Sequence, residues 1–134
     1  MYDSETITAL VVDDESADLE ALSAAAAAAG YRVITASDGR TALELFHAHA
    51  EEIGLLLTDV AMSPMNGCEL ARLLVQYKPD LKVIFVSGYI GRLLFASENP
   101  AIPYFGFLRK PVTHTDLELR IRRTLEEMAG RPAA

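Results

Sequence analysis

The segment LLTDVAMSPMNG (Leu56–Gly67) begins as an apolar run typical of a buried strand and then reaches an acid, Asp59. Burying a lone carboxylate costs several kcal/mol unless the group is paired with a cation or binds a metal. Asp59 is therefore expected either at a solvated strand end or among groups that use its charge. The segments before and after it distinguish these two interpretations.

Short apolar runs alternate with helical stretches along the whole chain. Five runs are apolar on both faces, as strands of a parallel sheet covered by helices are. The predicted strands are Ile7–Val12, Tyr31–Ala36, Ile53–Thr58, Leu81–Ser87 and Tyr104–Leu108. The predicted helices are 16–29, 39–50, 67–77, 91–97 and 114–128. This alternation predicts an α/β fold, a doubly wound five-stranded parallel sheet with helices on both faces.

Local signals mark the ends of the predicted helices. Gly30 follows an alanine-rich run at the position of a helix C-terminal glycine. Three residues are suited to N-cap positions, namely Asp38, Asn66 and Thr113. The last helix has an apolar stripe at three- and four-residue spacing, made of Leu117, Ile121, Leu125 and Met128.

Composition indicates one globular domain. The 134 residues are 51% hydrophobic, and we expect a domain over residues 1–128 with a frayed tail at 129–134. No apolar run reaches the roughly 18 residues of a membrane span, and the N-terminus lacks the features of a secretory signal. The single cysteine, Cys68, excludes an internal disulfide and fits a reducing cytoplasm. A net charge of −7 argues against direct nucleic-acid binding.

Polar residues stand at the carboxyl ends of four predicted strands. In chain order they are Asp13 and Asp14, Asp59, Ser87 and Lys110. Ligands of open α/β sheets bind beyond the carboxyl ends of the strands, where the strand order reverses. If the order is 2-1-3-4-5, the first and third strands are neighbours and their acids converge. Asp13 and Asp14 can then share one site only if the chain is already turning out of its strand.

The chemistry of such a cluster is specific. Three neighbouring carboxylates repel one another unless a cation lies between them, and their oxygens suit Mg²⁺ better than zinc. Lys110 adds a positive charge and Ser87 adds a hydroxyl donor. Each feature is common alone, as an acidic helix start, a turn or a surface loop. Together they fit an anionic tetrahedral ligand beside a carboxylate that can itself be phosphorylated.

The stretches ALVVDDE, LLLTDVAMSPMNG, VIFVSGY and FLRKPV, in this order and spacing, resemble the response-regulator receiver domain of two-component signalling over essentially the whole chain. The resemblance implies a flavodoxin-like sheet of order 2-1-3-4-5. It also implies that Asp59 receives a phosphoryl group from a histidine kinase or a histidine phosphotransfer protein. Asp13, Asp14, Asp59 and the carbonyl of Ala61 would hold Mg²⁺.

The resemblance implies a switch as well. The Ser87 hydroxyl would turn towards the phosphoryl group, Lys110 would pair with it, and the bond from Lys110 to Pro111 would be cis. Phe107 would swing inward and change the face made by the fourth helix, fifth strand and fifth helix. That face is also a candidate for homodimer contacts. The family commonly has proline where this chain has Ser63, with Pro64 one position later, so we expect the loop to bend differently.

The leading interpretation is a signalling module that catalyses only its own phosphorylation and dephosphorylation and is no enzyme towards a separate substrate. The stretch SGY is more typical of free-standing receivers or those of hybrid kinases than of DNA-binding regulators. One alternative is a receiver-like module that binds partners without phosphorylation. Another is a phosphatase of the haloacid-dehalogenase type. Against the phosphatase, the acids after the first strand are adjacent, and no insertion is available to close over a substrate.

Overall fold

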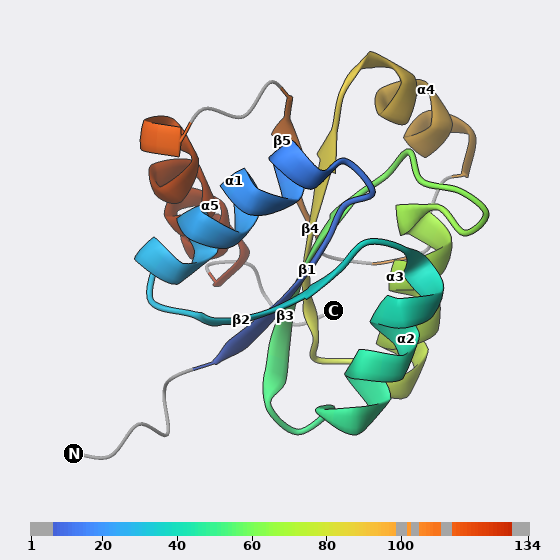
Figure 1. Ribbon diagram of the computed structural model, residues 1–134, viewed down its shortest axis with the longest axis horizontal. Coiled ribbons are helices and arrows are strands. Elements are labelled where there is room, and N and C mark those ends of the chain that lie inside the picture. The colour runs from blue at the N-terminus through green and yellow to red at the C-terminus, as the bar shows by residue number, and fades with distance from the viewer. Residues whose placement is uncertain (1–6, 99–101, 103–104, 111–113, 130–134) are drawn as a thin grey trace.

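The computed structural model describes residues 7–98, 102, 105–110 and 114–129. Five parallel strands form one sheet in the order β2-β1-β3-β4-β5 (Figure 1), which confirms the predicted fold and strand order. The strands are β1 (Thr8–Val12), β2 (Arg32–Ala36), β3 (Ile53–Asp59), β4 (Lys82–Ser87) and β5 (Gly106–Arg109). The helices are α1 (Ser16–Ala28), α2 (Gly39–Ala48), α3 (Gly67–Tyr77), α4 (Tyr89–Glu98) and α5 (His114–Ala129).

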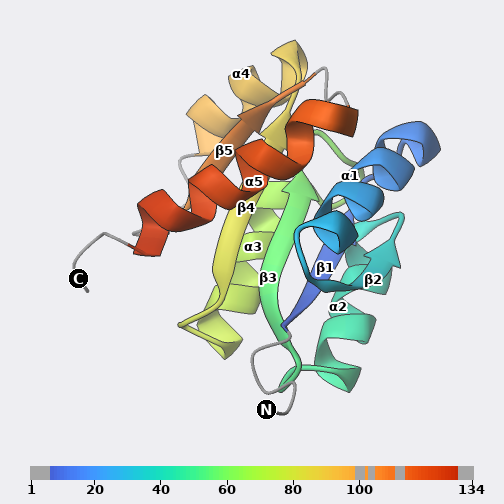
Figure 2. The same ribbon diagram turned by 90° about the vertical axis from the view of Figure 1, so that its left-hand side faces the viewer.

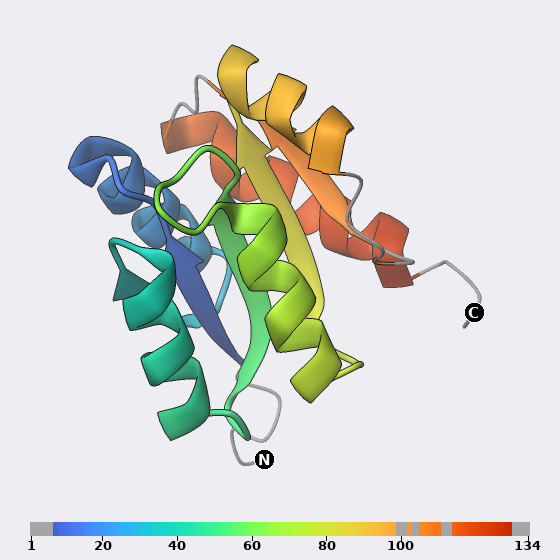
Figure 3. The same cartoon turned by 90° about the vertical axis from the view of Figure 1, so that its right-hand side faces the viewer.

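Helices cover both faces of the sheet. The helices α1 and α5 lie on one face (Figure 2), and α2, α3 and α4 lie on the other (Figure 3). Successive strand residues point to opposite faces, so each strand supplies two cores. In β1, for example, Ala9 and Val11 pack with α1 and α5, whereas Leu10 and Val12 pack with the other face. The uninterrupted apolar character of the strands follows from this two-sided burial.

The predicted helix ends in the described part of the chain are confirmed. Gly30 has a φ of 104°, and the backbone N–H groups of Gly30 and Tyr31 close the C-terminus of α1 on carbonyls of its last turn. Asp38 accepts a hydrogen bond of 2.7 Å from the Thr41 N–H. Asn66 forms a reciprocal capping box with Glu69. The predicted cap Thr113 lies outside the described residues.

Several predicted boundaries are wrong by one or two residues, and two of these differences bear on the site. The fourth helix begins at Tyr89 rather than at residue 91, so Gly91 lies inside the helix, at a close approach to β4. A Cβ atom at Gly91 would lie 2.7 Å from the Cβ atom of Ser87. The fifth strand begins at Gly106, since Phe105 packs its ring against Phe85 and Phe95 instead of extending the sheet. None of the described helices combines the length and the apolar character that a membrane span requires.

Candidate functional site

The predicted acids converge at the carboxyl end of the sheet. Strand β1 pairs with β3 in parallel and ends at Val12, so the chain has left the strand before Asp13 and Asp14. Asp59 is the last residue of β3. One carboxylate oxygen from each of the three aspartates lies within 4.8 Å of the others. Asp13 and Asp59 are buried while Asp14 is exposed, which leaves the cluster open to solvent on one side.

Lys110 joins this cluster from the end of β5. Its Nζ atom lies 2.8 Å from Asp18 Oδ2, 3.1 Å from Asp13 Oδ2 and 3.6 Å from Asp59 Oδ1. Sequence reasoning missed Asp18, which reaches the lysine from the first turn of α1. The only signal for it was an acid in the first turn of a helix, a common feature that favourable interaction with the helix dipole explains. The predicted cis bond after Lys110 involves Pro111, outside the described residues.

The electrostatics of the cluster follow from burial and crowding. Burial and the neighbouring Asp13 charge raise the pKa of Asp59 to about 6, although the Lys110 ammonium opposes this shift. Burial also raises the pKa of Asp13, although the hydrogen bond from the Glu15 backbone N–H and the Lys110 charge act to lower it. Burial alone would lower the pKa of Lys110, but contacts with Asp18, Asp59 and Asp13 outweigh it and raise that pKa. The cluster therefore holds more negative charge than its single lysine neutralises.

The donor set fits Mg²⁺. Three carboxylates at this spacing offer the hard oxygen ligands that Mg²⁺ prefers, and a divalent ion would offset the charge that Lys110 leaves uncompensated. Among the described residues, Asp13, Asp14 and Asp59 are the group whose side chains could hold a metal ion together. Ala61 lies in the loop directly after β3, and the role of its carbonyl as a ligand stays a prediction. In this loop the peptide bond between Ser63 and Pro64 is cis.

Two glycines let the backbone pack closely around the site. The Gly67 N–H donates to the Val60 carbonyl over 2.9 Å, and a side chain at Gly67 would overlap the carbonyl oxygen of Asp59. At the end of β4, the Ser87 hydroxyl is buried and has no hydrogen-bond partner among the described residues. Because such unpartnered groups are costly, this hydroxyl is a donor available for a ligand. Gly91 leaves the space around it.

Phe107 lies at the middle of β5 and is half-buried. Its ring centroid is 5.1 Å from that of Phe95 on α4. Phe95 in turn packs edge-on against Phe85 of β4 and against Phe105. The predicted switch residue is therefore part of an aromatic cluster that connects β4, α4 and β5.

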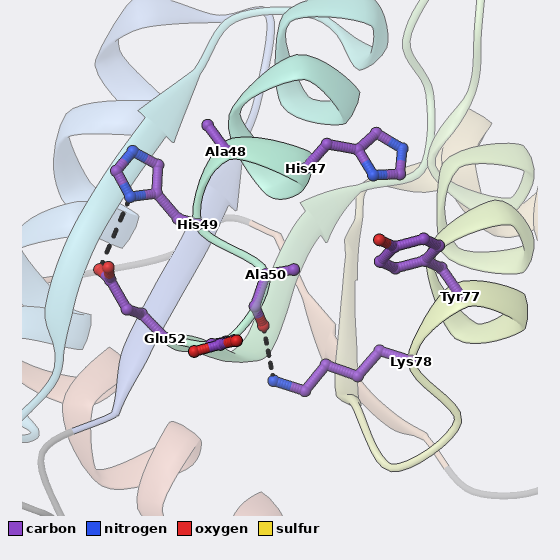
Figure 4. A pocket seen from close by; sticks show the side chains of 8 residues that line it. His47, Ala48, His49, Ala50, Glu52, Tyr77 and Lys78 are labelled. Carbon is purple, nitrogen blue, oxygen red and sulfur yellow. Dashed lines mark hydrogen bonds and ion pairs between the residues drawn. The ribbon is translucent and has the colours of Figure 1, made fainter.

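A hollow with a volume of about 680 Å³ is lined by residues around the C-terminal ends of α2 and α3 (Figure 4). It lies beside the start of β3, whereas Asp59 is at the end of that strand. Its lysine, Lys78, donates hydrogen bonds to the carbonyl oxygens of Ala50 (2.8 Å) and Ile53 (2.6 Å). Its His49 lies 3.6 Å from Glu52. The Lys78 ammonium is used by hydrogen bonds to the backbone at the start of β3. The predicted phosphoryl chemistry is therefore assigned to the carboxyl end of the sheet, where the aspartates lie.

Comparisons with known proteins agree with this geometry. Residues 9–122 match the family described as the response regulator receiver domain. Sensor kinase CckA of Brucella abortus is 38% identical over 124 residues, which are 92% of this chain and 13% of CckA. The response regulator receiver protein CpdR of the same organism is 38% identical over 80 residues, 60% of this chain and 65% of CpdR. This chain therefore spans less than two thirds of either relative.

Solved structures show the same fold. A response regulator receiver protein from Sinorhizobium medicae is 28% identical with a TM-score of 0.75, covering 91% of this chain and 96% of that one. A receiver domain protein from Clostridium thermocellum is 29% identical with a TM-score of 0.72, covering 90% and 95%. These matches, with the aspartate cluster and Lys110 at the carboxyl end of a 2-1-3-4-5 sheet, identify the chain as a member of the response regulator receiver domain family of two-component signalling.

Proposed function

We propose that this receiver domain is the phosphoacceptor of a phosphorelay, phosphorylated on Asp59 by a histidine kinase or a histidine phosphotransfer protein in a Mg²⁺-dependent reaction in the cytoplasm. The observation that carries the proposal is the placement of Asp59, which is buried among two further aspartates and lies 3.6 Å from the Lys110 ammonium. A carboxylate in such a position is a nucleophile beside groups that stabilise a transferred phosphoryl group.

In the proposed reaction a carboxylate oxygen of Asp59 bonds to phosphorus while the bond from phosphorus to the donor histidine nitrogen breaks. Mg²⁺ held by Asp13, Asp14, Asp59 and the Ala61 carbonyl would stabilise charge on the phosphoryl oxygens. Asp59 reacts as the ionised carboxylate, and with a pKa of about 6 its ionised fraction rises as the pH passes that value. Lys110 holds a positive charge beside the oxygens that gain charge.

The switch would begin at Ser87. Its buried and unpartnered hydroxyl can donate to a phosphoryl oxygen once that oxygen is present. Movement of Ser87 would alter the packing of the aromatic cluster to which Phe107 belongs, and so bias the face made by α4, β5 and α5. The apolar side chains of Tyr89, Ile90 and Leu93 are exposed on α4, which supports a partner or a second copy of the chain binding there.

The alternatives are weaker. Membership in the receiver family argues against a haloacid-dehalogenase-type phosphatase. A module that works without phosphorylation would have no use for the complete set of Asp13, Asp14, Asp59, Ser87 and Lys110. This chain would then act on no separate substrate and catalyse only the gain and loss of its own phosphoryl group.

The proposal is tested by intact mass after incubation with Mg²⁺ and acetyl phosphate, with Asp59→Asn as the control. We expect one phosphoryl adduct that disappears without Mg²⁺ and in the variant. Beryllofluoride, a phosphoryl mimic, provides the second readout in case the domain accepts phosphate only from its own kinase. Failure with both reagents would favour the phosphate-independent module.

A further inference from the structure

The ammonium group of Lys110 already has carboxylate partners before any phosphoryl group arrives. Among the described residues, three carboxylates lie within ion-pair distance of its Nζ atom. The shortest contact, 2.8 Å, is with Asp18, and the longest, 3.6 Å, is with Asp59. The lysine therefore sits closer to a carboxylate outside the acceptor than to the acceptor itself.

Asp18 differs from the other two partners of the lysine. Asp13 and Asp59 belong to the group of carboxylates that could hold a metal ion, and Asp18 does not. A cation bound by that group of carboxylates would attract Asp13 and Asp59 and weaken their ion pairs with Lys110. The Asp18 carboxylate, one third exposed on the first turn of α1, would keep its charge free for Lys110. Asp18 is thus the carboxylate that would still compete with a phosphoryl group for the Lys110 ammonium when the metal is bound.

Resting on the proposed function of Asp59, we propose that Asp18 is a positioning residue that holds Lys110 back from the phosphoacceptor and so weakens the binding of a phosphoryl group there. A phosphoryl group on Asp59 would compete with the Asp18 carboxylate for the Lys110 ammonium, which lies 2.8 Å from Asp18 Oδ2 in the free protein. Removing the Asp18 charge removes this competitor. An ion pair of this exposure corresponds to a change of about two- to fivefold in affinity or rate.

The test measures the affinity of the full chain for beryllofluoride at saturating Mg²⁺, and the rate of phosphorylation by acetyl phosphate. Asp18→Asn removes the charge and keeps the shape. Glu20→Gln is the matched control, because Glu20 is an exposed acid on the same helix and does not belong to the ion pairs of Lys110. Asp18→Glu restores the charge. The same Asp18→Asn change is repeated in a Lys110→Ala background to separate competition for the lysine from simple charge repulsion.

We expect Asp18→Asn to bind beryllofluoride about two to five times more tightly than the parent and to be phosphorylated faster by a similar factor. Glu20→Gln should behave like the parent, Asp18→Glu should return most of the way to it, and the gain should vanish in Lys110→Ala. Weaker binding in Asp18→Asn, an equal gain in Glu20→Gln, or a gain that persists without Lys110 would each overturn the inference. If the parent itself binds no beryllofluoride and forms no adduct, the proposed function fails, which is a different result.

Discussion

The backbone N–H of Lys110 donates a hydrogen bond of 2.8 Å to the carbonyl oxygen of Ser87. This bond joins the end of β4 to the residue that follows β5, so the backbone holds the lysine and the serine together at the carboxyl end of the sheet. The groups proposed to bind a phosphoryl oxygen are therefore placed directly at the ends of two neighbouring strands. Their substitution should affect phosphorylation more than folding.

Loss of the lysine should weaken the phosphorylated state strongly. Hydrogen bonds to charged groups contribute about 1.5–3 kcal/mol, so we expect Lys110→Ala to lower beryllofluoride affinity by about 10- to 100-fold. Lys82→Ala removes a charge from an exposed residue at the start of β4 and is the control. Titration calorimetry at saturating Mg²⁺ measures both variants. Equal affinities in the parent and Lys110→Ala would show that Lys110 does not contribute to binding of the phosphoryl mimic.

Asp59 should destabilise the metal-free protein at neutral pH. Its pKa of about 6 lies above its ordinary value of 3.8, so the folded state binds the proton more tightly than the unfolded state does. The stability that this proton provides is present below pH 3.8 and is lost as the pH rises through 6. At pH 7 without Mg²⁺ we therefore expect Asp59→Asn to be more stable than the parent by about 1–3 kcal/mol.

Denaturant unfolding between pH 4 and 8 measures this difference. The gain in Asp59→Asn should shrink as the pH falls through 6, because Asp59 in the parent then becomes neutral. Glu20→Gln, which neutralises an exposed acid on α1, should show no such dependence. A gain that is constant with pH would show that the carboxylate charge is not its cause.

Mg²⁺ should stabilise the parent by binding the folded state. We expect the melting temperature to rise by about 2–8 °C at concentrations well above the dissociation constant. The rise should be lost in Asp13→Asn, because that variant removes a buried member of the carboxylate cluster. Differential scanning fluorimetry in NaCl of equal ionic strength controls for screening. An equal rise in NaCl, or in Asp13→Asn, would argue against a site at these carboxylates.

A side chain at Gly91 should disturb the site through Ser87. The added Cβ would lie 2.7 Å from the Ser87 Cβ atom, so one of the two must move. We expect Gly91→Ala to lose about 1–3 kcal/mol of stability and to be phosphorylated more slowly. Gly88→Ala is the control, since its Cβ would meet Lys110 Cβ at 4.0 Å, an ordinary contact. Chemical denaturation and intact mass measure the two effects, and a stable, normally phosphorylated Gly91→Ala would contradict the packing argument.

The sequence carried the fold and much of the site because the relevant signals are local. Strand β3 has the apolar run Leu55–Leu57 just before Thr58 and Asp59, and Asn66 with Glu69 forms a capping box that can be recognised from spacing alone. The contact between Asp18 and Lys110 could not be recognised in this way. It depends on the distance between two elements far apart in the chain, while an acid in the first turn of a helix has a sufficient local explanation.

Gly91 also has a role that local signals do not reveal. Glycine is a poor helix former, yet Gly91 lies in the first turn of α4. The close approach to Ser87 explains why a glycine lies inside the helix, and only the packing of α4 on β4 reveals it. The glycine that contradicts local helix propensity thus lies beside Ser87, a residue of the candidate site.

The most direct test locates the phosphoryl group. After incubation with acetyl phosphate and Mg²⁺, borohydride reduction converts a phosphorylated aspartate to homoserine, and peptide mass spectrometry identifies its position. We expect homoserine at position 59, dependent on Mg²⁺ and on the phosphodonor. Homoserine at position 13, 14 or 18 instead, or an adduct that forms equally without Mg²⁺, would show that Asp59 is not the phosphoacceptor of a Mg²⁺ site.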